Sequence, residues 1–433
     1  MASRRISVLL LLARTLCLVG LSSPSAAQAD PHMVGAAACR ECHSARFNSW
    51  SESLHSRVVR PISEAGESLP SGEEAAQSPF PLESAKFVLG SMHKLAFLQQ
   101  SGEHLTVLPV EFDVKKRTWN PISVHLWDPQ AVVGALPDAS ASKVVDWNLR
   151  CARCHTTGYD AATGTFAELG VACESCHGPG SVHVETKGKE RMVNPEVLTG
   201  EGGNHVCGQC HSYGRDQATG KPFPTNYRPG DDLTKTFTFA QPTVGTTTPL
   251  FWGNGTARQH HAQYNEFLQS KHFGSGLRCF DCHQVHRLRT SLPSPNTNLM
   301  ARTERYMLKR VAQNICPTCH LPSSPSFRLS GDAATGKLID THTHHPDVIT
   351  KVKSGPRIPS RPNGWSAQET MLCGECHMPS ASREEAGYTI RSHTFKPPGP
   401  GEAPGAPNAC TECHSQQGAD WVERQLKSWR AAR

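Results

Sequence analysis

The chain has 433 residues, of which only 37% are hydrophobic, and it contains 35 glycines and 32 prolines. This composition argues against a conventional side-chain core through most of the chain, because too little apolar surface is available for burial. The formal charge is +6, to which the first 29 residues contribute three arginines. The basic balance therefore does not indicate a nucleic-acid partner.

The first 29 residues resemble a secretory signal peptide. Arg4 and Arg5 precede an apolar run, and Ala27-Gln28-Ala29 provides a cleavage site of the small-x-small type. We therefore expect export to the periplasm or the cell surface, with a twin-arginine signal or a lipoprotein cysteine at Cys17 as the less favoured alternatives. No later stretch has the length of a membrane span, so we expect no transmembrane segment.

Few regular elements are predicted, and most of them are short. Residues 104–114 alternate in polarity, which predicts a strand within a small β hairpin near 104–125. Residues 61–83 and 396–408 are rich in glycine, proline and polar residues and are predicted to be loops. Helices are predicted at 262–272, 302–315 and 420–432, the last of which is amphipathic.

Sixteen of the seventeen cysteines form eight Cys-x-x-Cys pairs, and a histidine follows each pair directly. We number them motif 1 to motif 8 in chain order: Cys39/Cys42/His43, Cys151/Cys154/His155, Cys173/Cys176/His177, Cys207/Cys210/His211, Cys279/Cys282/His283, Cys316/Cys319/His320, Cys373/Cys376/His377 and Cys410/Cys413/His414. This spacing puts both sulfurs on one helical turn, where they can form thioethers with a haem while the histidine reaches the iron.

Zinc, thioredoxin-like and disulfide interpretations of the cysteine pairs are weaker. A zinc site needs two pairs or a spaced histidine pair, and a thioredoxin-like motif needs only one pair. A disulfide scaffold is the serious alternative in an oxidising compartment, but it does not account for a histidine after every pair. We predict eight covalently bound c-type haems, whose iron the motif histidines ligate and whose macrocycles supply the missing apolar bulk.

The second ligand of each iron is also predicted to be histidine, because fifteen further histidines are present and methionine is scarce. Bis-histidine ligation implies low reduction potentials. The predicted second ligands are His55, His93, His183, His272, His286, His345 and His393. In the cluster of His342, His344 and His345, the last is preferred and His344 comes next. His205 is left open, whereas His104, His125, His260 and His261 are expected at the surface or beside ligands.

The predicted fold class is mostly α and irregular, with short helices and long loops wrapped around a chain of eight haems. The expected divisions are a signal peptide at 1–29, an N-terminal part with motif 1 and the β element at 30–145, motifs 2–4 at 146–225, motifs 5 and 6 at 226–330, and motifs 7 and 8 with the C-terminal helix at 331–433.

Several segments resemble the multihaem cytochromes grouped around cytochrome c-554, which are related to the hydroxylamine oxidoreductase superfamily. The segments that carry this resemblance are 50–55, 147–158, 170–180, 376–379, 391–395 and 407–414. The resemblance implies that His55, His93, His183 and His393 are second ligands. Many members of that family continue into tetratricopeptide repeats, and we expect no such docking surface here.

The leading hypothesis is an electron carrier between respiratory redox proteins, either quinol-linked proteins or other cytochromes, with no catalytic residue. The alternative is an oxidoreductase that acts on a small N- or S-oxyanion or on hydroxylamine at one haem with an open site. For that alternative, motif 4 is the first place to look, with Tyr213 and Arg215 beside it. A third hypothesis is an extracellular polymer of haem proteins, and the oligomeric state is left open.

Overall fold

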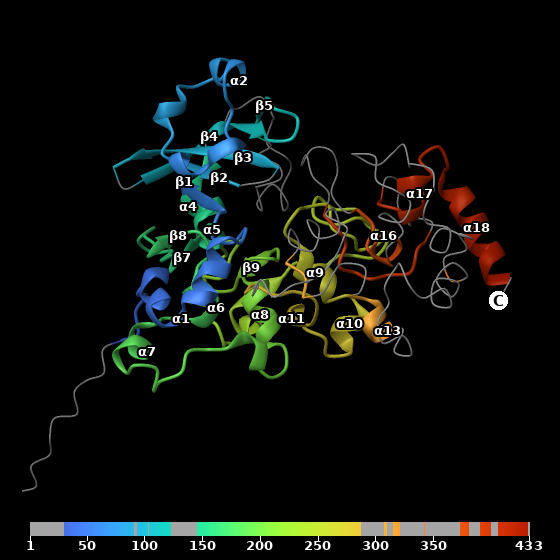
Figure 1. Ribbon diagram of the computed structural model, residues 1–433. Coiled ribbons are helices and arrows are strands. Elements are labelled where there is room, and N and C mark those ends of the chain that lie inside the picture. Colours follow the sequence, from blue (N-terminus) through green and yellow to red (C-terminus); the bar gives the residue numbers. More distant parts are fainter. Residues whose placement is uncertain are drawn as a thin grey trace, which may run out of the picture. The chain divides into compact units, whose positions relative to one another are not determined.

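The computed structural model describes residues 30–90, 93–102, 104–122, 145–286, 307–309, 315–320, 342, 373–380, 390–399 and 406–431 (Figure 1). The chain divides into two units, Met1–Pro31 and His32–Arg433, and the description below concerns the second. The predicted signal peptide, most of the predicted helix at 302–315 and His345 lie outside the described residues. Within the described part of the chain, every helix is too short or too polar to cross a membrane.

Short helices carry the eight motifs. They are α1 (Ala36–Ser51), α4 (Trp147–Arg150), α5 (Ala152–His155), α6 (Cys173–His177), α8 (Gly202–Gly208), α11 (Cys279–Cys282), α13 (Pro317–His320), α16 (Cys373–His377) and α17 (Ala409–Cys413). In motifs 2, 4, 5, 6 and 8 the histidine N–H donates to the carbonyl of the first cysteine, at 2.8–3.0 Å. This hydrogen bond closes one helical turn, so both cysteines and the histidine of a motif share it.

The remaining described helices are α2 (Glu73–Ala76), α7 (Ser181–Glu185), α9 (Gln263–Phe267), α10 (Lys271–Gly274) and α18 (Ala419–Ala431). The predicted C-terminal helix is therefore confirmed as α18, with Val422 fully buried. The predicted helix at 262–272 is instead two helices. Ser270 lies between them with an extended backbone, and its hydroxyl accepts the Phe273 N–H at the start of α10. This cap begins a new helix rather than continuing α9.

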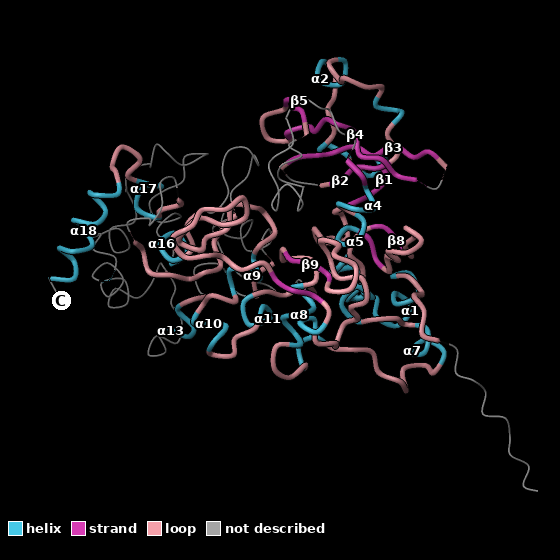
Figure 2. Tube along the Cα trace, turned by 180° about the vertical axis from the view of Figure 1, so that it is seen from behind, coloured by secondary structure: helices cyan, strands magenta, loops and turns pink. Residues whose placement is uncertain are grey.

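A six-stranded antiparallel sheet lies between motifs 1 and 2 in the sequence. Its strands are β1 (Val59–Pro61), β2 (Phe87–Leu89), β3 (Lys94–Ser101), β4 (His104–Asp113), β5 (Thr118–Pro121) and β6 (Val145–Asp146). The order is β1-β2-β3-β4-β5, with β6 also paired to β4, and Figure 2 shows the strands in magenta. The predicted strand at 104–114 is confirmed as β4, and its hairpin with β5 is one part of this larger sheet.

The two faces of this sheet bury different clusters, as alternation along a strand requires. On one face, Leu95, Phe97 and Phe112 pack with Phe80 and Trp119. The opposite face packs against motif 2. Its cluster consists of Val59, Leu89, Ala96, Leu98, Val107, Ile122, Trp147, Cys151 and Ala152. The sheet therefore covers the helices that carry motif 2.

Two smaller sheets, each of two strands, follow along the chain. Strand β7 (Thr156–Thr157) pairs with β8 (Glu168–Leu169), and β9 (Gly214–Asp216) pairs with β10 (Phe237–Phe239). The 3₁₀ turns are η1 (Ile62–Glu64), η2 (Gly66–Ser68), η3 (Leu82–Ser84), η4 (Pro195–Val197) and η5 (Leu233–Lys235). Short elements joined by loops agree with the predicted irregular, mostly helical fold, although the sheet is larger than predicted.

Candidate haem centres

Within the described residues, six motif histidines face a second histidine ring at nearly the same distance. The ring centres are separated by 6.1 Å for His43 and His183, 6.0 Å for His177 and His286, 6.3 Å for His211 and His55, 6.3 Å for His283 and His393, 5.8 Å for His320 and His272, and 6.2 Å for His377 and His342. Metal–imidazole bonds of about 2 Å on both sides of one ion put two ring centres about 6 Å apart. The pairs therefore fit the two axial positions of an iron.

Each of these pairs joins distant parts of the chain. His183 follows motif 3 but faces motif 1, and His286 follows motif 5 but faces motif 3. His55 follows motif 1 and faces motif 4, and His393 lies between motifs 7 and 8 but faces motif 5. None of these six motifs is paired with the histidine that follows it most closely, so the pairs connect different motifs with one another.

The second ring nitrogen of several of these histidines is held by a hydrogen bond. The Nδ1–H groups of His177, His183 and His393 donate to the carbonyls of Val193, Glu190 and Arg391, at 2.6–2.9 Å. The Nδ1 of His211 lies 3.3 Å from Oε1 of Gln263. A hydrogen bond at Nδ1 fixes the ring orientation and leaves Nε2 to bind a metal, as is usual for ligating histidines.

Three of the paired histidines are held in the neutral form. Burial, together with neighbouring histidines, lowers the pKa of His55, His286 and His393 to about 4. A neutral imidazole is the form that binds a metal. The buried Nδ1 atoms of His55 and His286 have no hydrogen-bond partner among the described residues.

The sixteen motif cysteines are free thiols in the structure, and sulfurs of different motifs lie close together. Four such pairs are within hydrogen-bonding reach: Cys39 and Cys173, Cys154 and Cys210, Cys207 and Cys279, and Cys316 and Cys373. Three more pairs of cysteines from different motifs lie close enough to interact electrostatically: Cys176 with Cys210, Cys282 with Cys319, and Cys376 with Cys410. The motifs therefore follow one another in space in the order 1-3-4-5-6-7-8, and motif 2 adjoins motif 4 as a side branch.

Six of the residues predicted to bind haem are exposed in the structure: Cys42, His43, His211, Cys319, His320 and His414. Cys42 is the second cysteine of motif 1. His414 is the histidine of motif 8, and its ring centre lies 4.9 Å from that of Trp421. This contact differs from the predicted pairing of two histidines, because an indole N–H is a donor and has no lone pair for a metal. The six exposed residues belong to motifs 1, 4, 6 and 8. The haem-binding roles of all the motif cysteines and histidines stay predictions.

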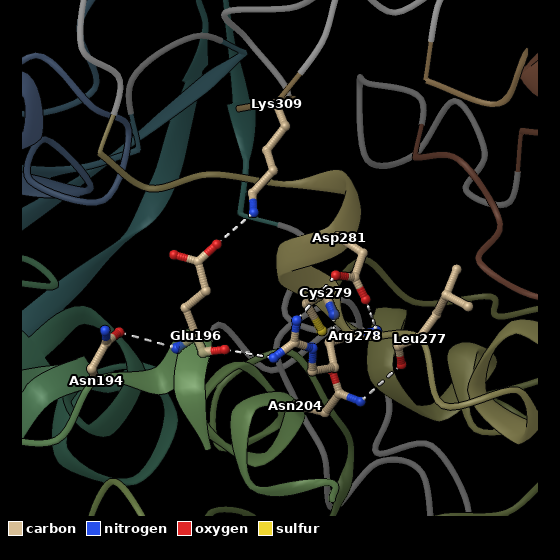
Figure 3. Close-up of polar contacts among 8 residues, drawn as sticks. All are labelled: Asn194, Glu196, Asn204, Leu277, Arg278, Cys279, Asp281 and Lys309. Atoms are coloured by element: carbon tan, nitrogen blue, oxygen red, sulfur yellow. Dashed lines mark hydrogen bonds and ion pairs between the residues drawn. The ribbon is translucent and has the colours of Figure 1, made fainter. Parts of the chain in front are cut away.

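Polar side chains fix the contact between motifs 4 and 5 (Figure 3). Asn204, on the helix that leads into motif 4, accepts the N–H of Cys279 at 2.8 Å and donates to the carbonyl of Leu277 at 3.4 Å. Arg278 donates to the carbonyl of Glu196, whose carboxylate pairs with Lys309 at 2.7 Å. Motif 5 is therefore attached directly to the elements around motif 4.

A different group of polar rings surrounds motif 2. Among the described residues, no second histidine ring lies at the paired distance from His155. Tyr213 stacks on His261 at 3.8 Å, with its hydroxyl 2.9 Å from His261 Nδ1, and His260 Nε2 lies 3.3 Å from the same nitrogen. Burial lowers the pKa of His260 to about 3, with His155 and His211 as electrostatic neighbours, and it lowers the pKa of His261 well below its usual value. Three polar rings are therefore gathered close to His155.

Five of the seven histidines predicted as second ligands lie opposite motif histidines. His93 lies just before β3, His345 lies outside the described residues, and for both the ligand role stays a prediction. His342 faces His377 instead, although the sequence favoured His345 and His344 within that cluster. Tyr213 was considered with motif 4, yet the structure places His55 opposite His211, and Arg215 is exposed and donates to the carbonyl of Gly220.

Comparisons with known proteins find one family model and solved structures that resemble this chain. The family model described as "Cytochrome c554 and c-prime" matches residues 125–178, which contain motifs 2 and 3. The crystal structure of the outer cell wall cytochrome OcwA is similar to this chain, with 24% identity over 92% of this chain and 87% of that one, and a TM-score of 0.62. No curated protein matches the chain.

Two further solved structures match less closely. One is the undecahaem cytochrome from the S-layer of Carboxydothermus ferrireducens, with 17% identity over 94% of this chain and 61% of that one, and a TM-score of 0.47. The other is the octahaem sulfite reductase MccA of Wolinella succinogenes, with 16% identity over 85% of this chain and 59% of that one, and a TM-score of 0.41. The chain therefore shares the fold of the cytochrome OcwA, and its residues 125–178 match the family model of cytochrome c554 and c-prime.

Proposed function

We propose that this chain is an exported octahaem cytochrome that transfers electrons between respiratory redox proteins. The observation that carries this proposal is the set of six histidine pairs at the spacing of two axial ligands. Each haem, when bound, supplies an iron that cycles between its ferric and ferrous forms and so carries one electron. The sixteen cysteines and eight motif histidines would hold the haems.

The second ligands follow from the pairs. They are His183 for motif 1, His286 for motif 3, His55 for motif 4, His393 for motif 5, His272 for motif 6 and His342 for motif 7. His93 and His345 remain candidates for motifs 2 and 8. Histidine on both sides lacks the potential-raising effect of methionine, so low potentials are expected.

The order of the motifs supports a continuous path for electron transfer from haem to haem rather than a set of isolated haems. Adjacent sulfurs link motifs 1, 3, 4, 5, 6, 7 and 8 in an unbroken series. Motifs 1 and 8 are the two ends of this series. We infer that electrons enter and leave near these ends.

Location outside the cytoplasm rests on the signal-like first 29 residues, and the fold is shared with a cytochrome whose name places it in the outer cell wall. Fractionation of cells that make the tagged chain would test this. Recovery of the full-length, haem-free chain from the cytoplasm would contradict export.

The haem assignment is tested by the intact mass and the spectrum of the purified protein. We expect the mass of the mature polypeptide plus eight haems, and an electron paramagnetic resonance spectrum dominated by low-spin ferric signals. Fewer than eight haems, or high-spin signals from several centres, would contradict the assignment.

A second function is favoured by the Tyr213, His260 and His261 group beside motif 2. If motif 2 keeps an open position, these rings provide hydrogen-bond donors for a small N- or S-oxyanion or for hydroxylamine. The hydroxyl of Tyr213 and the imidazole of His261 share a 2.9 Å hydrogen bond, so a proton can pass between them. This group supports motif 2, rather than motif 4, as the site of the enzymatic alternative.

Nitrite and hydroxylamine, supplied with a chemically reduced dye, test this second function. We expect turnover that falls at least tenfold in Tyr213→Phe and in His261→Gln. The matched control is Tyr159→Phe, which removes a hydroxyl that donates to the Asn148 carbonyl away from this group. An entirely low-spin spectrum, or equal turnover in all variants, would refute it.

A further inference from the structure

One short segment between motifs 7 and 8 touches four of the haem centres proposed above. We call residues 390–396 the strap. Its main chain pairs with the segment that follows motif 7, because Ser392 N–H donates to the carbonyl of Pro379 at 3.0 Å and Ser380 forms an isolated antiparallel bridge with Arg391. Main-chain contacts alone therefore attach the strap to the segment that follows motif 7.

The side chain of Arg391 joins motifs 7 and 8. It pairs with the carboxylate of Glu375, which lies between the two cysteines of motif 7, and it lies 3.7 Å from the carboxylate of Glu412 in motif 8. The side chains of Arg391, Glu375 and Glu412 are only 15%, 5% and 16% exposed. Glu412 also accepts from the hydroxyl of Ser380 at 2.9 Å. One guanidinium thus lies between two largely buried carboxylates from neighbouring motifs.

The main chain of Arg391 supports motif 5. Its carbonyl accepts the Nδ1–H of His393 at 2.9 Å, and His393 faces His283. Glu266, which is buried, accepts from the Ser392 hydroxyl at 2.9 Å and from the His393 N–H at 2.8 Å. The position of the His393 ring is therefore set by hydrogen bonds on both sides of the residue.

The end of the strap reaches motifs 6 and 7. Phe395 has a φ of 50°, in the left-handed region that residues other than glycine seldom adopt. This turn brings the Phe395 ring 4.5 Å from that of His272, which faces His320 of motif 6. It also leaves the Lys396 carbonyl to accept a hydrogen bond from His377 of motif 7.

We propose that Arg391 is a positioning residue that holds motifs 5, 7 and 8 in fixed relation and balances the charge between motifs 7 and 8. Its guanidinium is planar and presents several donors at once, which a lysine ammonium does not. Without it, the largely buried Glu375 and Glu412 would lose the positive charge that lies between them. Negative charge stabilises a ferric centre over a ferrous one, so the potentials of the nearest haems should fall. This inference rests on the proposed octahaem assignment.

The test compares Arg391→Gln and Arg391→Lys in the full-length haem-loaded protein. Intact mass is measured first, so that the haem number of the wild type tests the octahaem assignment before any variant is compared. A spectroscopic reductive titration then follows. We expect the Gln variant to shift two or three of the eight haems to lower potential, and the Lys variant to shift them less.

The matched control is Arg117→Gln. Arg117 forms a hydrogen-bonded ion pair with Glu74 in the sheet region, among residues that touch no motif. It should leave every haem potential unchanged. A Gln titration that matches the wild type would overturn the proposal. Loss of haem from both Arg391 variants would also overturn it, because that result marks Arg391 as a residue needed for folding rather than for positioning.

Discussion

Removal of the carboxylate of Glu174 should destabilise the protein more than most single substitutions. Glu174 lies between the cysteines of motif 3, is 1% exposed, and accepts the N–H groups of Val34, Gly35 and Gly180, at 2.7–3.1 Å. Val34 and Gly35 lead into α1, which carries motif 1, and Gly180 begins α7, which carries His183. One carboxylate thus fixes both halves of the pair formed by His43 and His183.

The magnitude follows from the three hydrogen bonds. A buried donor left without a partner costs about 1–3 kcal/mol, so Glu174→Ala should lower the free energy of unfolding by roughly 3–5 kcal/mol. Glu174→Gln keeps one acceptor oxygen and should cost about half as much. Because the anchor of His183 is lost, the Ala variant should also convert one haem from low spin to high spin.

Denaturant unfolding followed by circular dichroism and haem absorbance measures this effect, with electron paramagnetic resonance for the spin state. Glu185→Gln is the control, because Glu185 is exposed on α7, and exposed substitutions usually change stability by less than about 0.5 kcal/mol. The reasoning would be refuted if the free energy of unfolding of Glu174→Ala differed from that of the wild type by less than about 0.5 kcal/mol. It would also be refuted if Glu185→Gln lowered the free energy of unfolding as much as Glu174→Ala does.

Three further outcomes are expected. His286→Met should raise the potential of one haem in a redox titration without changing the haem number, whereas His104→Met, at the exposed start of β4, should change neither. Burial raises the pKa of Glu111 above its usual 4.5. Protonated Glu111 therefore contributes its full share to the stability of the folded protein below pH 4.5, and this share is lost as the pH rises through the folded pKa. The thermal midpoint of Glu111→Gln should fall less steeply with pH over this window than that of the wild type. Val422→Ala should cost about 1–2 kcal/mol in thermal unfolding because Val422 is fully buried, while Val184→Ala, at an exposed site, should cost almost nothing.

The motif helices and their chemistry could be predicted from the sequence because they are local. A Cys-x-x-Cys-His segment closes a single helical turn on its own, as the hydrogen bond from His283 N–H to the Cys279 carbonyl at 2.8 Å illustrates. The partner of each motif histidine could not be predicted in this way. In the sequence, His43 and His183 are separated by the whole sheet and by motifs 2 and 3. No local sequence pattern indicates that their rings face each other.

Most of the six-stranded sheet was also missed, for a related reason. Strands β1 and β2 have three residues each and β6 has two, which is too short for alternation to be recognised. Only β4, with ten residues, shows a readable pattern. The other strands are stabilised by pairing with neighbouring strands of the sheet and by the clusters on both faces, which are contacts between distant residues.

The residues between the two cysteines of a motif were treated as spacers in the sequence, yet they connect the motifs. Arg153 in motif 2 donates to Gln209 in motif 4 at 3.0 Å, and Gln209 in turn donates to the carbonyl of Ser175 in motif 3 at 3.0 Å. Glu375 and Glu412 meet at Arg391 in the same manner. The spacing of the cysteines is set by haem attachment, whereas the residues within that spacing are free to specify which motifs lie together.

This division of roles bears on the choice between a wire and an enzyme. Motif 2 lies beside the series of the other seven motifs. Cys154 contacts Cys210 and Arg153 contacts Gln209 of motif 4, and Thr157, just after motif 2, lies 2.8 Å from the Ser175 hydroxyl of motif 3. A centre at the end of a side branch adds nothing to transfer between the two ends of the series. Its value to the protein is greatest if an electron delivered there is consumed by a reaction, for which Tyr213 and His261 would be the proton donors. If a second histidine binds the motif 2 iron, this haem can only hold one electron. If the position is open, this haem can pass the electron to a bound substrate.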